Sequence, residues 1–195
     1  MMRPLLAAFL GAVAIFVWFA VAHMFTPLGM AGIDYLPNEA PVSDALAASI
    51  GTDPGMYMFP TGGLTKQSSG EEEEKGMERM MEEMKTKPSG LLVYKPAGST
   101  FNFGKSLAIE FLTDFAIAFI AVLLLAQTRI VTFGGRVGFV VMIGLLAAIA
   151  AHVPHWNWYS FPGAYALANM FMAIVAMFLA GLVIAAIYKP AQPDR

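Results

Sequence analysis

The stretch HVPHWNWYSFP, residues 152–162, separates an apolar run at 137–153 from a second apolar run at 163–189. It holds two of the three histidines of the chain, two of its three tryptophans and two of its prolines. Apolar runs of about 17–25 residues are long enough for a helix to cross a bilayer. We therefore predict a turn at 154–162 between two spanning helices. The rings of Trp156, Trp158 and Tyr159 would be interface anchors, because such side chains collect at the bilayer surface.

The composition of the chain supports a membrane protein. Apolar residues make up 57% of its 195 residues and charged residues only 13%. A soluble domain is about half apolar and about a quarter charged. The absence of cysteine excludes disulfides, iron–sulfur clusters and cysteine-ligated zinc. The net charge of −2 gives no indication of a nucleic-acid partner. The first partner that the sequence predicts is thus the lipid bilayer.

Two further apolar runs complete the spanning segments, at 1–26 and at 105–127. In the first, Ala20-Val21-Ala22 matches the A-x-A pattern of signal-peptide cleavage, so removal of residues 1–22 is one interpretation. The run is about 20 residues long, which is enough to span, and we favour an uncleaved helix. A short loop at 128–136 and a tail at 190–195 remain. The sequence predicts a mainly α fold, a four-helix transmembrane bundle.

Residues 27–104 are of a different kind, rich in Pro, Gly and charged residues and without a long apolar run. The segment between Asn38 and Gly51 is typical of a short helix with a proline near its start and a glycine past its end. Short apolar runs at 56–59 and 91–94 indicate two strands. We expect these elements to form a small α+β cap inserted between the first and second spans.

A second helix of this cap is expected at 71–87. Ser69 and Glu72 have the spacing of a capping box, and Pro88 would end the helix. Its methionines recur at i, i+3, i+4 and i+7, at positions 77, 80, 81 and 84. Thioethers suit Cu(I), so a copper-handling array is one hypothesis. We favour an ordinary apolar stripe, to which methionine adapts well.

The orientation follows from the basic residues of the short loops and the chain ends. Arg3, Arg129, Arg136, Lys189 and Arg195 all fall on one side of a four-span layout. The positive-inside rule makes that side cytoplasmic. Both termini are then expected in the cytoplasm and the cap outside, in the periplasm or the extracellular space, with the chain in the cell's inner membrane.

On this layout the polar residues that are unusual in spanning helices fall in the outer half of the bundle. Helices rise about 1.5 Å per residue, so each residue's depth follows from its distance to the outer end of its span. Four different spans and the outer turn contribute to this predicted polar site. Its candidate members are His23, Glu110, Asp114, His152, His155, Asn157 and Asn169.

Glu110 and Asp114 are four residues apart and share one helix face. A carboxylate in a spanning helix costs at least about 2.5 kcal/mol and normally faces the bundle interior. One hypothesis is therefore a proton or ion pathway through these two acids. The structural alternative is that Glu110 reaches the interface near Lys105 and that Asp114 is a neutral acid hydrogen-bonded to a neighbouring helix.

The histidines permit a metal site at His23, His152 and His155, since imidazole and carboxylate suit Zn, Fe or Cu. A b-type haem between His23 and His152 is a second arrangement, because haem needs only axial imidazoles from facing helices. Neither cofactor is required by the sequence. His152-x-x-His155 is not the i, i+4 pair of a zinc protease, and we favour interfacial histidines that hydrogen-bond the loop and the headgroups.

No motif for a reaction or for nucleotide binding occurs, and whether the chain is an enzyme is left open. The function that we favour is a non-catalytic integral membrane protein, an accessory, scaffolding or sensing subunit, with a polar site at the outer leaflet. Its partner would be another membrane protein or a second copy of itself. The alternatives are a metal- or haem-binding redox protein using the histidines, and a proton or ion pathway through Glu110 and Asp114.

Overall fold

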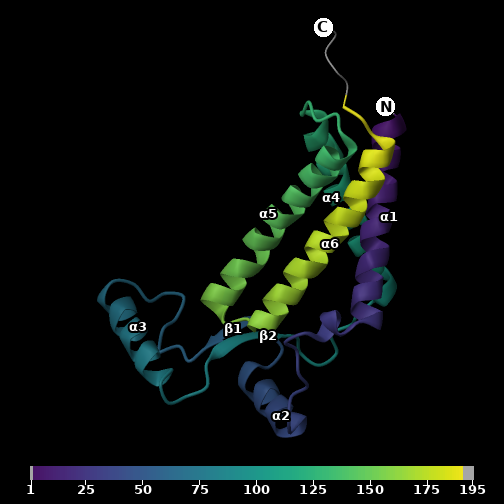
Figure 1. Ribbon diagram of the computed structural model, residues 1–195. Helices are drawn as coiled ribbons and strands as arrows, with labels where there is room; N and C mark the ends of the chain where they lie inside the picture. Colours follow the sequence, from purple (N-terminus) through teal and green to yellow (C-terminus); the bar gives the residue numbers. More distant parts are fainter. Residues whose placement is uncertain (1, 191–195) are drawn as a thin grey trace. The chain divides into compact units, whose positions relative to one another are not determined.

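A computed structural model describes residues 2–190 of the chain. Four long apolar helices form a bundle (Figure 1): α1 (Met2–Phe25), α4 (Phe103–Ala126), α5 (Phe133–Tyr159) and α6 (Gly163–Ile187). By length and composition each of the four is able to cross a membrane, so the chain is a multi-pass membrane protein. The predicted fold class, a mainly α bundle with a small α/β segment after its first helix, is confirmed.

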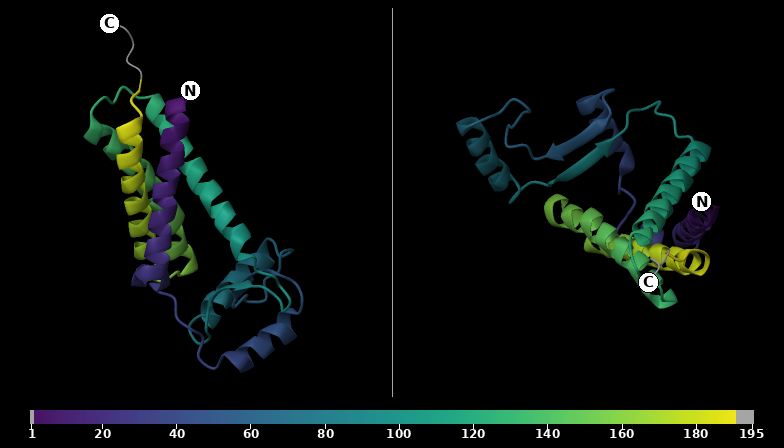
Figure 2. Two further views of the ribbon diagram at one scale, coloured as in Figure 1. Left: turned by 90° about the vertical axis from the view of Figure 1, so that its right-hand side faces the viewer. Right: turned by 90° about the horizontal axis from the view of Figure 1, so that it is seen from above.

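The four helices are arranged in the order α4, α1, α6, α5. Helix α1 packs against both α4 and α6, and α5 packs against α6, whereas α4 and α5 meet only marginally. Figure 2 shows α4 running obliquely, with its last turns beside α1 and its first turns apart from the other helices. All residues from 103 to 110 are accordingly exposed, and burial along α4 begins only at its middle.

Small residues allow the helix backbones to approach closely, as expected in membrane bundles. Gly11 of α1 faces Ile184 of α6, and a Cβ built on it would lie 3.2 Å from that side chain and 3.4 Å from the Cβ of Ala118. Gly144 of α5 lies directly against Met177 of α6. One polar contact joins α1 to α6, since the indole Nε1 of Trp18 donates to the carbonyl oxygen of Met172 at 2.9 Å.

The end of the bundle at which α1 finishes and α6 begins, here called the far end, is closed by a short 3₁₀ helix, η1 (Pro27–Met30). The Thr26 side chain accepts from the N–H of Leu28 and donates to the carbonyl of Ala22 at 2.6 Å. Gly32 then packs onto the first turn of α6 with φ of +73°. A Cβ at Gly32 would lie 2.8 Å from the backbone nitrogen of Tyr165, so only glycine fits there.

Helix α5 is longer than the apolar run at 137–153. It begins at Phe133, where the Thr132 side chain accepts from the N–H of Gly135 at 3.1 Å, and it continues through Pro154 to Tyr159. The connection to α6 is reduced to residues 160–162, so the predicted turn at 154–162 is mostly helical.

Proline removes one helical hydrogen bond, but membrane helices tolerate this where side chains satisfy the freed groups. Because Pro154 has no N–H, the carbonyl of Ala150 has no helical donor. The neighbouring carbonyl of Ala151 lies within hydrogen-bond reach of the Nδ1 of His155. The helix ends at Ser160, whose left-handed backbone is a common helix terminator.

Residues 35–101 form a second compact unit, which is described by itself. Its elements are α2 (Glu39–Ile50), β1 (Gly55–Phe59), α3 (Glu71–Glu83) and β2 (Gly90–Tyr94). The two strands pair antiparallel, with Tyr57 opposite Leu92 and Met56 opposite Val93. The helices and strands expected from the sequence of this segment are therefore present.

The start and the end of α3 differ from the prediction. The residue before the helix is Gly70, not Ser69, and no side chain caps it. Gly70 has φ of +57°, a conformation that glycine adopts without strain. Four glutamates in the first turn interact favourably with the helix dipole in place of a capping box. The last regular residue is Glu83, and turns replace the helix expected as far as 87.

Candidate functional site

Asp114 is a buried acidic residue near the middle of α4. Its residue is only 1% exposed, and its Oδ2 has no hydrogen-bond partner among the described residues. The register of α4 against α1 follows from Gly11, which faces Ala118. Ile15 lies four residues after Gly11, and Asp114 lies four residues before Ala118. Because the two helices are antiparallel, these two buried residues are level with each other. The bundle therefore holds an unpaired carboxyl group at mid-depth.

Glu110 does not share this environment, although the i, i+4 spacing places it on the same face of α4. It lies in the first turns of the helix, where every side chain is exposed. On α4 the two acids therefore differ, because Asp114 is buried and Glu110, one turn away, is exposed.

His23 and Asp114 are not at one depth. His23 lies eight residues beyond Ile15 on α1, which corresponds to about 12 Å along the helix axis. Its ring makes an edge contact with Phe19, with the ring centroids 6.1 Å apart. His23 itself is exposed at the far end of the bundle.

His152 and Asn169 come to the same level of the bundle. Gly144 on α5 faces Met177 on the antiparallel helix α6. His152 lies eight residues after Gly144, and Asn169 lies eight residues before Met177, so the two are level. Both are half-buried. The side-chain amide of Asn169 donates to the carbonyl of Tyr165 in its own helix at 2.8 Å. Of the predicted cluster, this is the pair that the helix register brings level.

His155 belongs to a chain of rings at the far end. Its imidazole centroid is 5.1 Å from that of Phe161 and 5.9 Å from that of Tyr159, and Phe161 continues to Tyr165 at 5.6 Å. Asn157 is exposed on the last turns of α5. These contacts account for His155 as part of an aromatic cluster at the end of the helix.

The seven candidates of the predicted polar site thus lie at several levels between mid-depth and the far end of the bundle. Among residues 2–190, no three His, Asp or Glu side chains come together in an arrangement that could hold a metal ion. The metal hypothesis consequently gains no ligand set of three from these side chains, and the haem hypothesis, which needs only two imidazoles, stays a prediction. The roles given to the individual residues remain predictions.

Trp156, Trp158 and Tyr159 are exposed on the last turns of α5, as interface anchors would be. A groove of about 300 Å³ lies beside them between α5 and α6. It is lined by Val153, Trp156, Gly163, Ala166, Leu167 and Met170. These side chains are almost entirely apolar, which suits hydrocarbon and not a charged ligand.

Arg136 is a buried polar residue whose role the sequence interpretation missed by assigning it to the loop at 128–136. It lies in the first turn of α5, where its guanidinium donates to the carbonyls of Val131 and of Ala185, the latter at 2.9 Å. Ala185 belongs to the last turn of α6, whose carbonyls have no helical partner. The signal that could have found this position is Thr132, a helix-capping residue type just before it.

Comparison with known proteins does not add to this description. No protein-family model matches the chain, and searches of curated proteins and of solved structures give no match either.

Proposed function

We propose that the chain is a non-catalytic membrane-anchored subunit whose residues 35–101 bind a partner protein. One observation carries this proposal, the exposed apolar face of the β1–β2 ribbon. Met56 is 65% exposed, Met58 54% and Val93 66%. Strand alternation places these three side chains on the same face of the ribbon, because Met56 pairs with Val93 and Met58 with Leu91. We call this surface the ribbon face.

The opposite face of the ribbon is occupied within the unit. The Tyr57 hydroxyl donates to the carbonyl of Asp53, and the Tyr94 hydroxyl donates to that of Gly51, each at 2.9 Å. The loop before β1 therefore covers that side, and residues 35–101 supply no cover for the ribbon face. A two-stranded ribbon is marginally stable alone and gains stability when an apolar face is buried. A protein partner would provide that burial.

Site-specific photo-crosslinking in native membranes tests the proposal. p-Benzoylphenylalanine at Val93 is expected to give a discrete adduct with a second polypeptide. The same probe at Lys66, an exposed residue of the loop before α3, is the matched control and should give none. Replacing Met56 and Val93 by threonine keeps strand propensity but makes the face polar, and should prevent the partner from copurifying.

The adduct's identity decides the outcome. A crosslink from Val93 to residues 2–34 or 102–190 of the same chain would mean that the ribbon face is covered internally, which contradicts the proposal. Adducts with lipid alone would contradict it as well.

A second candidate function rests on Asp114. An ionisable residue inside a membrane bundle is by default a candidate for an ion or proton pathway, because burying it is costly. Its Oδ2 is buried without a partner among the described side chains. A pathway through Asp114 would make proton or ion flux into liposomes fall in Asp114→Asn. The exposed Glu110 supplies the control, since Glu110→Gln should lower flux less; equal flux in wild type and Asp114→Asn would exclude the pathway.

A further inference from the structure

Helix α3 packs within its unit through one face only. A Cβ on Gly76 would lie 2.3 Å from the side chain of Leu64, and one on Gly62 would lie 2.6 Å from the backbone nitrogen of Met80. Arg79 donates from Nε to the carbonyl of Gly62 at 2.8 Å. The loop at 61–64 therefore covers the side of α3 that carries Gly76, Arg79 and Met80.

The other face of α3, together with Met84 just past its end, exposes three methionines. Met77, Met81 and Met84 are each about half exposed. At 3.6 residues per turn, these positions fall within an arc of about 60° around the helix axis. A stripe of this kind is normally buried, and here only Met80 of the four methionines lies on the packed side. We call the three exposed residues the methionine face.

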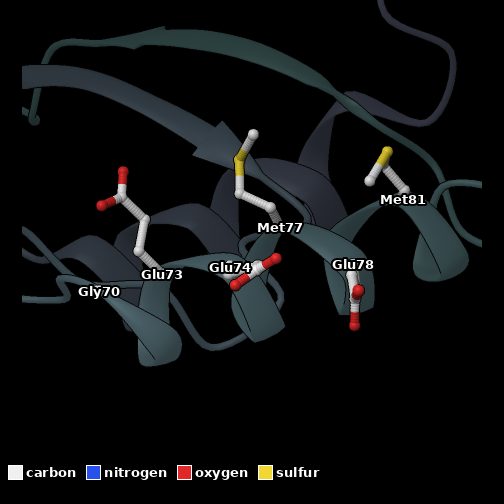
Figure 3. A pocket seen from close by; sticks show the side chains of 6 residues that line it. All are labelled: Gly70, Glu73, Glu74, Met77, Glu78 and Met81. Carbon is white, nitrogen blue, oxygen red and sulfur yellow. The ribbon is translucent and has the colours of Figure 1, made fainter.

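Two residues of the methionine face, Met77 and Met81, line a hollow of about 480 Å³ together with acidic residues, and Met84 lies outside it. It is lined by Gly70, Glu73, Glu74, Met77, Glu78 and Met81. Figure 3 shows the side chains of Glu73, Met77 and Met81 on the same side of the helix, in successive turns. The thioethers of Met77 and Met81 thus lie on the side of the helix that carries Glu73, whereas Glu78 points to the other side.

The basic residues next to these glutamates are engaged elsewhere. Lys75 pairs with Glu71 at 3.1 Å, Lys85 with Glu82 at 2.5 Å and Lys87 with Glu83 at 2.8 Å. The ion pairs of the described residues on α3 include none with Glu73, Glu74 or Glu78. None of these three carboxylates is neutralised by a direct ion pair with these lysines, which favours the approach of an external cation.

The donor atoms select the kind of cation. Thioethers are soft ligands that suit Cu(I), whereas Mg²⁺ and Ca²⁺ require oxygen ligands. Residues 35–101 contain neither histidine nor cysteine, so no stronger soft ligand competes within this unit. We propose that the methionine face binds one Cu(I) ion through the thioethers of Met77, Met81 and Met84, with Glu73, Glu74 and Glu78 supplying attraction.

Anaerobic titration of the full chain in detergent with Cu(I), against a chromophoric Cu(I) chelator, tests this site. Wild type is expected to hold one Cu(I) per chain. Met77→Leu/Met81→Leu/Met84→Leu should lower the affinity more than tenfold, because leucine keeps the volume and apolar character but has no sulfur donor. Copper X-ray absorption should show sulfur neighbours in wild type that the triple variant lacks.

The matched control removes as many sulfurs elsewhere. Met56→Leu/Met58→Leu/Met142→Leu changes three exposed methionines outside α3 and should bind Cu(I) like wild type. Equal affinity in wild type and the α3 triple variant would overturn the proposal, and so would an equal loss in the control. Glu73→Gln/Glu74→Gln/Glu78→Gln should weaken binding with unchanged stoichiometry. If it abolished binding while the α3 leucine variant did not, the ion would be held by carboxylates alone and the thioether site would be wrong.

The leucine substitutions also separate metal binding from partner binding. Leucine preserves an apolar docking surface, so the ribbon-face crosslink proposed above should survive in the α3 triple variant. Loss of Cu(I) binding with retention of that crosslink is the expected result, and the two proposals can therefore fail independently.

Discussion

At the scale of single residues, Asp114 and Arg136 illustrate two ways of burying a polar side chain in this bundle. Arg136 is tied to two backbone carbonyls, although its Nε has no partner within residues 2–190. Asp114 has an oxygen without any partner among the described residues. Arg136 supplies hydrogen-bond donors to backbone carbonyls that lack a helical donor, which is a structural role. The arrangement at Asp114 leaves a polar atom unsatisfied, which is the more suggestive of a functional site.

Replacing Arg136 by methionine should destabilise the bundle. The carbonyls of Val131 and Ala185 would lose their donor, and a buried carbonyl without a partner costs about 1–3 kcal/mol. Equilibrium unfolding in mixed micelles would measure the loss of free energy. Arg136→Lys keeps the charge but lacks the planar fork that reaches two carbonyls, so its loss should be intermediate. A methionine variant as stable as wild type would show that the two carbonyls find other donors.

At the scale of the helices, the contact between α5 and α6 depends on the absence of a side chain at one position. A Cβ on Gly144 would lie 2.6 Å from the Cβ and Cγ of Met177, which is too close for two carbon atoms. A Cβ on Gly138, six residues earlier on the same helix, would meet no described atom within 4 Å. The two glycines therefore have different roles despite similar sequence surroundings.

Gly144→Ala is expected to lower the unfolding free energy by about 1–3 kcal/mol, the usual cost of overpacking a tight contact. Gly138→Ala is the matched control, and should leave stability unchanged or slightly higher because alanine favours helix. Thermal unfolding of both variants in the same detergent provides the comparison. Similar midpoints for the two would argue against a close α5–α6 contact.

The helices themselves could be predicted because apolar run length is a strong signal, but their ends could not. The start of α5 depends on Thr132, whose side chain caps the helix, and the helix continues through Pro154 to Tyr159. The length of the apolar run predicts neither the start of α5 nor its continuation through Pro154. For α3, a plausible capping box at Ser69 was wrong because Gly70 adopts the backbone conformation that starts the helix.

At the scale of the whole molecule, depth counted along each helix separately does not say which polar side chains come level with one another. The contact of Gly11 with Ala118 sets the register of α4 on α1 and places Asp114 level with Ile15, about 12 Å along the axis from His23. Register arises from how two surfaces fit, and a single sequence does not reveal it. The exposed methionine face was equally hidden, because the same spacing is normal for a buried stripe.

The predicted orientation can be tested directly because the chain has no native cysteine. In intact cells, a membrane-impermeant maleimide should label Lys66→Cys, in the segment expected outside. It should not label Gln127→Cys, in the α4–α5 connection expected in the cytoplasm, until the cells are permeabilised. Both positions are exposed, which makes them a matched pair. Labelling of Gln127→Cys alone would mean that the orientation is inverted.

The order in which the helices pack has a consequence for biogenesis. Helix α6 joins α5 to the α1–α4 pair, yet it is the last of the four to be synthesised. Until it inserts, the surface of α1 around Gly11 and Trp18 faces lipid or an insertion factor, and α5 lacks its main neighbour. A nascent chain that stops before residue 163 therefore leaves α5 without its main packing surface and the α1 surface around Gly11 uncovered, and this exposed small-residue surface is what membrane quality control would encounter.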